Sequence, residues 1–116
     1  MTIQIQAVDT GVWTVTLDGR VDLPAARALE DALNELCDAG HSRIVVDLSS
    51  VPYLAPAGLK ALLSGLRRAR LLAGDVRLAG MTERVREVFD MSGFDRVFVI
   101  YLAASGAVAS FTLTET

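Results

Sequence analysis

The sequence VDLSSVPYLAPAGLKALL, residues 46–63, decides the fold of this chain. It begins inside a short apolar run, RIVVDL at residues 43–48, which is typical of a strand covered on both faces. A polar turn and the loop VPYLAPAG follow, and Pro56 suits the first position of a helix because its φ angle is fixed. A stripe of leucines predicts a helix over residues 57–73, which Gly74 ends. Open α/β sheets place their binding surfaces at such strand-to-helix loops.

Upstream of this unit the sequence predicts an opening β-hairpin and a first helix. Two short runs alternate apolar and polar residues around DTG at residues 9–11, which predicts strands with one buried face. The residues of that face are Ile3, Ile5, Ala7, Trp13, Val15 and Leu17. Asp22 is placed to cap the helix, Pro24 is tolerated in its first turn, and Gly40 ends it. The apolar positions at helical spacing are Ala26, Leu29, Leu33, Leu36 and Cys37.

Downstream, strands and helices continue to alternate. We expect a strand at residues 75–79, a helix at 82–91 and a fifth strand at 96–102. The order is ββαβαβαβ, which predicts an α/β fold with a mixed, mostly parallel sheet that opens with an antiparallel hairpin and has helices packed on it. The tail forms a short helix over residues 105–111 or frays.

Composition limits the class of protein. The chain has 116 residues, 52% of them hydrophobic, and a mean hydropathy of +0.40. Charged residues interrupt every apolar run before the roughly 18 residues that would span a bilayer, and no signal peptide is visible, so we expect a cytoplasmic protein. Cys37 is the only cysteine, which excludes an internal disulfide, and its helical spacing predicts that it is buried.

The charge pattern argues against nucleic acid as a partner. The net charge is −3 and the pI about 5.0, whereas nucleic-acid binding needs clustered positive charge. The second helix nevertheless carries basic residues along one side, which are read as a solvated face or, alternatively, as a surface for an acidic partner. They are Lys60, Arg67, Arg68 and Arg70.

The sequence offers no convincing catalytic or metal-binding set. His41 is the only histidine, follows a helix end, and is interpreted as a solvent-facing cap. One cysteine and one histidine do not make a zinc site, and neither a P-loop nor GxGxxG is present. Asp18, Asp22 and Asp47 lie near strand ends, where capping and turn roles are simpler explanations than acid/base work. We therefore expect no enzyme, no metal and no cofactor.

The loop remains as the candidate site. Val51, Tyr53 and Leu54 either plug the top of the core or contact a partner directly. The start of the helix adds backbone N–H groups that the helix itself leaves unpaired. Together these features make the loop the best candidate surface of the chain.

Three segments in order resemble the STAS domain, the sulfate transporter and anti-sigma factor antagonist fold. LDGRVD at residues 17–22 resembles the family's turn into the first helix. RIVVDLSSVPYLAPAGLKALL resembles its central strand, loop and second helix, and VREVFDMSGFDRVFVIY its last helix and strand, with FDMSG similar to sporulation-type antagonists. The resemblance implies one STAS domain over residues 1–116, with its core at 3–102 and a tail at 103–116.

The resemblance also implies a regulatory role with an altered switch. Family antagonists bind an anti-sigma factor that is also a serine kinase, which releases itself by phosphorylating a serine in Asp-Ser-Ser-Gly. Placed on this sequence, that motif falls on Ala55, Pro56, Ala57 and Gly58, so only the glycine is kept. Asp22 matches the family aspartate near the acceptor. Proline has no hydroxyl group, so phosphorylation at the usual position is chemically excluded.

The resemblance implies binding to an anti-sigma factor or kinase through residues 51–60, without phosphorylation at the usual site. The expected contact residues are Asp22, Val51, Pro52, Tyr53, Leu54, Ala55, Pro56, Ala57, Gly58 and Lys60. Alternatives are a STAS interaction subunit of an ABC lipid-transport or signalling complex, and nucleotide binding at the helix start. A homodimer through the hairpin edge or the loop, and phosphorylation of another serine, also stay open; the candidate serines are Ser49, Ser50 and Ser64.

Overall fold

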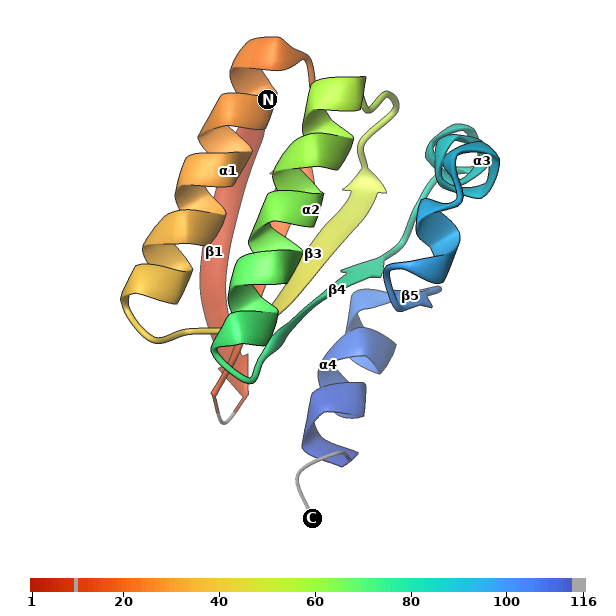
Figure 1. The fold of residues 1–116 in the computed structure, drawn as a ribbon. Helices are drawn as coiled ribbons and strands as arrows, with labels where there is room; N and C mark the ends of the chain where they lie inside the picture. Colours follow the sequence, from red (N-terminus) through yellow and green to blue (C-terminus); the bar gives the residue numbers. More distant parts are fainter. Residues whose placement is uncertain (10, 114–116) are drawn as a thin grey trace.

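The computed structural model describes residues 1–9 and 11–113 and confirms the predicted order of elements (Figure 1). In chain order these are β1 (Thr2–Asp9), β2 (Val12–Asp18), α1 (Leu23–Asp38), β3 (Arg43–Ser50), α2 (Pro56–Leu71), β4 (Asp75–Ala79), α3 (Glu83–Ser92), a 3-10 helix η1 (Phe94–Arg96), β5 (Ile100–Tyr101) and α4 (Ala104–Leu113). The sheet order is β1-β2-β3-β4-β5. β1 and β2 are antiparallel and the other neighbours are parallel, so the expected mixed, mostly parallel sheet is confirmed.

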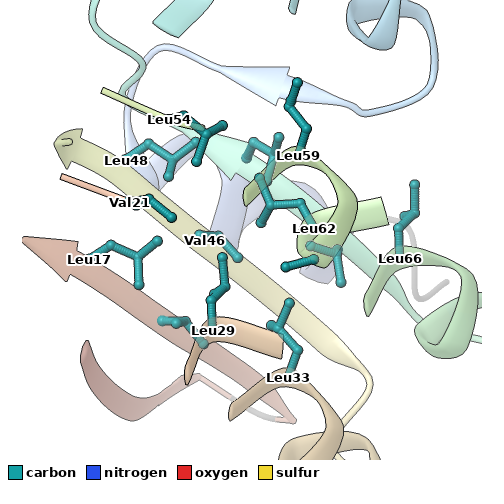
Figure 2. Packing of buried hydrophobic residues seen from close by; sticks show 14 of the residues in the cluster. Leu17, Val21, Leu29, Leu33, Val46, Leu48, Leu54, Leu59, Leu62 and Leu66 are labelled. Atoms are coloured by element: carbon teal, nitrogen blue, oxygen red, sulfur yellow. The ribbon is translucent and has the colours of Figure 1, made fainter. Parts of the chain in front are cut away.

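Helices cover both faces of the sheet. This explains why the sequence of the central strand, β3, is apolar on both faces. Ile44 and Val46 of β3 belong to the main core, which α1, α2 and α3 build on one face. Val45, which points to the other face, packs in a smaller core with Ala107 and Phe111 of α4. Figure 2 shows leucines of β2, β3, α1 and α2 meeting in the main core.

The hairpin prediction is correct in topology and wrong about burial. In β2 the residues Val15 and Leu17 are fully buried, as expected. In β1 only Ile3 packs against the core, whereas Ile5 is 42% exposed. The reason is position, because β1 is the terminal strand and lacks a neighbour on its outer side among the described residues. The connecting Thr10 lies outside the described residues.

The C-terminal region differs from prediction in two respects. The expected strand over residues 96–102 shrinks to Ile100–Tyr101 because η1 includes Arg96, and the N–H groups of Val97 and Phe98 donate to the Phe94 carbonyl. The Phe98 ring is buried and meets the Phe89 ring edge-on, with ring centres 5.8 Å apart. The tail helix exists as α4 and extends the buried core beyond residue 102, where we expected it to end. The guanidinium carbon of Arg77 in β4 lies 3.9 Å from the ring centre of Phe111 in α4, and this cation–π contact links the two elements.

Cys37 is buried in the main core, as predicted. Burial raises the pKa of its thiol, the Arg68 guanidinium lowers it in part, and the Asp38 carboxylate adds to the rise. We expect labelling by a thiol reagent at mild alkaline pH to be slower in the folded protein than in urea, by on the order of tenfold or more, because the thiolate is the reactive form. Equal labelling rates in the two states would contradict this burial.

The raised pKa of the Cys37 thiol makes the stability of the folded protein depend on pH in the alkaline range. The folded thiol keeps its proton at pH values where the unfolded thiol loses it, so stability falls as the pH rises above the ordinary pKa of a thiol. Urea unfolding of the wild type beside Cys37→Ala should show this alkaline loss only in the wild type.

Candidate functional site

The loop between β3 and α2 is held on both sides by hydrogen bonds. On one side the Val21 N–H donates to the Tyr53 carbonyl and the Ala55 N–H donates to the Val21 carbonyl, each over 2.9 Å. These bonds form a parallel bridge between Val21 and Leu54. On the other side the Thr82 hydroxyl donates to the Val51 carbonyl over 3.4 Å. The loop therefore has a defined backbone conformation rather than a free one.

Burial divides the expected contact residues into two groups. Val51 is fully buried, Leu54 is 3% exposed, and Gly58 is buried, so these three residues support the loop from below and are not available for direct contact. Val51 and Leu54 both lie in the main core, as the interpretation of these residues as core packing expects. The remaining residues are exposed or half-buried, and we call them the loop surface: Asp22, Pro52, Tyr53, Ala55, Pro56, Ala57 and Lys60.

Gly58 has a packing role that explains why a glycine is needed here. A Cβ atom added at this position would lie 2.5 Å from Cδ1 of Leu54 and 3.0 Å from Cγ1 of Val21. Such contacts are far closer than van der Waals separation, so a larger residue would push Leu54 and the loop away from the helix. The glycine therefore preserves the shape of the loop.

The bridge between Val21 and Leu54 places two helix N-termini side by side. The next residues along the chain, Asp22 and Ala55, are the N-caps of α1 and α2. Oδ1 of Asp22 accepts a hydrogen bond from the Ala25 N–H over 3.0 Å, whereas Ala55 has no side chain that could do the same for α2. One helix start is thus capped by a carboxylate and its neighbour is left uncapped.

Pro56 is the first residue of α2 and is exposed. Its ring has neither a hydroxyl group nor an N–H, and the flanking Ala55 and Ala57 add only methyl groups. The exposed Lys60 follows one helical turn later. The start of α2 can therefore dock another surface by shape and by the positive end of a helix, but residues 55–57 carry no hydroxyl group that could accept phosphate.

Sequence reasoning missed Arg20, which borders the loop surface. Its guanidinium carbon lies 4.5 Å from the ring centre of Tyr53, in a cation–π arrangement. The residue lies within LDGRVD, but sequence spacing alone did not indicate that it would reach a ring more than thirty positions away.

The capping role of Asp22 can be measured. We expect Asp22→Ala to lower the free energy of unfolding by about 0.5–2 kcal/mol, because the Ala25 N–H loses its acceptor. Asp22→Asn keeps an oxygen at the cap and should lower the free energy of unfolding by at most about 0.3 kcal/mol. Urea unfolding of both variants tests the assignment, and equal losses for Ala and Asn would refute it.

The alternative serines differ in surroundings. Ser49 and Ser50 are exposed at the end of β3. The Ser49 N–H donates to Oδ1 of Asp47 over 3.0 Å, so the Asp47 carboxylate has a local structural partner, although Asp47 lies inside β3 and not in the expected turn. Ser64 is half-buried in a groove of about 640 Å³ between α1 and α2.

Other candidate groups have structural partners. His41 stacks on Trp13 with ring centres 4.4 Å apart. Arg68 forms an ion pair with Asp38, and Arg70 forms one with Asp75, so both basic residues have partners within this chain.

In the described ranges no three or more His, Cys, Asp and Glu residues gather as a metal site. Over the same ranges, no helix has the length and apolar content needed to cross a membrane.

Comparison with known proteins agrees with this architecture. The family model described as "Mlab, STAS domain" matches residues 6–102. BtrV of Bordetella bronchiseptica, whose name describes an anti-sigma factor antagonist, is 32% identical over 111 residues, which cover 96% of this chain and 95% of BtrV. RsfB of Mycobacterium tuberculosis, an anti-sigma-F factor antagonist, is 30% identical over 93 residues, covering 78% of this chain and 74% of RsfB.

Solved structures show the same fold. An anti-sigma factor antagonist from Mycobacterium paratuberculosis superposes with a TM-score of 0.85 at 27% identity, covering 94% of this chain and 92% of that one. A protein from Thermotoga maritima, described as an anti-sigma factor antagonist, superposes with a TM-score of 0.87 at 21% identity, covering 93% and 92%. The chain belongs to the STAS domain family.

Proposed function

We propose that this protein is an anti-sigma factor antagonist that binds its anti-sigma factor through the loop surface and stays bound when ATP is present. The names of BtrV and RsfB support the class of function. One observation carries the rest of the proposal, which is the exposed Pro56 at the first position of α2. It occupies the place where family members of the switched type have the serine that receives phosphate.

The local structure supports a surface that keeps the backbone arrangement for docking but has no serine at position 56 that could be phosphorylated. Gly58 is the one residue of the serine motif that packing requires, and it is present. Asp22 still caps α1 beside the start of α2. A phosphate would add roughly two negative charges at the contact, and without an acceptor at position 56 that repulsion cannot arise there. Binding is therefore constitutive at this site.

We infer a regulator that acts by binding rather than by catalysis. The loop surface presents the positive end of α2 and the exposed Lys60 beside a largely apolar patch of prolines and alanines. A partner surface with a carboxylate or carbonyl acceptor facing the helix start would complement it. This protein would then affect transcription only by binding the anti-sigma factor, and not through chemistry on its own chain.

An affinity capture from lysate of the protein's own cells tests the class of partner. The bait is the wild type, and the control is a Pro52→Asp, Lys60→Glu variant, which adds negative charge to the exposed loop surface without touching the core. We expect an anti-sigma factor with a serine-kinase domain to be recovered by the wild type and lost from the control. Recovery of the same proteins by both baits would contradict binding through the loop surface.

A second candidate is an interaction subunit of an ABC lipid-transport complex. The observation that favours it is again the absence of a hydroxyl group at Pro56, because a subunit that only docks on its partner needs no phosphate acceptor there. The same capture distinguishes the candidates, since transporter ATPases and membrane components would then replace the anti-sigma factor in the wild-type sample.

A further inference from the structure

The sheet has an open edge formed by a long strand. β1 is the terminal strand of the sheet and pairs only with β2 in the described part of the chain (Figure 1). The backbone N–H and C=O groups on the outer side of such a strand lack ladder partners, which makes the strand a template for another β-strand. The opposite edge, β5, has two residues and offers far less.

Over residues 2–7 β1 lacks the features by which proteins usually protect such an edge, and its one register shift lies at the hairpin end, between Ala7 and Asp9. Residues 2–8 read TIQIQAV and contain no charged residue and no proline. Ile5 and Val8 are each 42% exposed, so apolar side chains accompany the free backbone groups. The strand is eight residues long, above the usual length of five or six. It is thus suited to pairing with another strand.

The sequence of β1 is complementary to itself. If a two-fold axis passes through Ile5, that residue faces its own copy, and Ile3 of one chain faces Ala7 of the other. On the opposite face Gln4 meets Gln6, where the amide groups can exchange hydrogen bonds. Apolar residues meet apolar residues and amides meet amides. A register shifted by one residue would instead set isoleucines against glutamines.

We propose that β1 pairs antiparallel with β1 of a second copy of this chain, in the register centred on Ile5. The contact is isologous and closes at two subunits. Because an axis perpendicular to the sheet keeps each face of one copy next to the same face of the other, the two five-stranded sheets join into one continuous sheet.

The arrangement has a consequence for partner binding. The two-fold axis reverses strand direction, so the carboxyl ends of the parallel strands point in opposite directions in the two copies. The loop surfaces, which follow β3, then lie at opposite ends of the joined sheet. One dimer would present two separate docking surfaces, and this inference does not depend on which partner they bind.

Sedimentation equilibrium of the full chain over a wide concentration range tests the proposal. We expect the wild-type mass to rise from the 12.4 kDa of one chain toward twice that value as concentration increases. Ile5→Lys sets two ammonium groups against each other at the centre of the contact and should raise the dimer dissociation constant by about tenfold or more. Leu102→Lys, at a leucine that is 97% exposed and distant from β1 in the sheet order, should leave it unchanged.

A charge pair tests the register. Gln4→Glu with Gln6→Lys places opposite charges across both Gln4–Gln6 contacts and should lower the dissociation constant, whereas Gln4→Glu with Gln6→Glu should raise it. Both side chains are exposed, and circular dichroism checks that each variant is folded. A wild type that stays monomeric at every concentration would overturn the proposal. So would equal effects of Ile5→Lys and Leu102→Lys, or equal effects of the two charge variants.

Discussion

A variant that carries Ala55→Asp, Pro56→Ser and Ala57→Ser is expected to acquire the switch that the wild type lacks. With its kinase partner and ATP, it should take up one phosphate per chain, and the wild type none. The phosphate would lie on the exposed first residue of α2, inside the proposed contact. We expect the apparent dissociation constant of the complex to rise by about 100-fold, which corresponds to about 2.7 kcal/mol.

Ala55→Asp alone is the matched control for this experiment. Ala55 has the extended backbone of an N-cap, and its side chain makes no capping hydrogen bond. An aspartate there should raise the free energy of unfolding by about 0.5–2 kcal/mol and add no phosphate. If the triple variant bound the kinase and still took up no phosphate with ATP, the serine would not be the missing part of the switch.

The second large effect concerns stability and comes from Gly74→Ala. A Cβ atom at Gly74 would overlap the carbonyl group of Ser42, which is backbone and cannot rotate away. That same carbonyl accepts the Asp75 N–H over 2.9 Å where β4 begins to pair with β3. We expect a loss of about 3 kcal/mol or more in the free energy of unfolding, seen as a melting temperature lower by about 10 °C or more.

Gly106→Ala provides the matched control for that substitution. Gly106 lies inside α4, and a Cβ atom there would meet Cδ2 of Tyr101 at an ordinary 3.8 Å. Alanine should therefore stabilise the protein by about 0.5–1 kcal/mol. If both glycine variants melted at the same temperature, the close approach of Gly74 to Ser42 would be wrong.

The parts of the fold that sequence predicts well are those with a strong local signal. Asp22 marks the start of α1, Pro56 marks the start of α2, and the leucine stripes indicate which helix face is buried. The β-branched run of β3 correctly indicates a strand covered on both faces, because α1 and α2 lie on one side and α4 on the other.

The errors arise where local pattern does not specify the neighbours of an element. Alternation in β1 predicts a strand but does not show that the strand is at an edge, so the exposure of Ile5 was missed. The apolar run at residues 96–102 indicates burial and not whether that burial serves pairing or, as for Phe98, ring packing. In the site, Leu54 is buried because the distant Val21 pairs with it, and spacing does not reveal such a bridge.

We expect that phosphorylation does not switch the complex of this protein with its anti-sigma factor. The most direct measurement is calorimetric titration of the wild-type protein with its purified partner, with and without ATP and magnesium, followed by mass spectrometry of the sample. We expect the same dissociation constant in both conditions and no phosphate on this chain. Phosphate on Ser49, Ser50 or Ser64, together with loss of the complex when ATP is present, would contradict it.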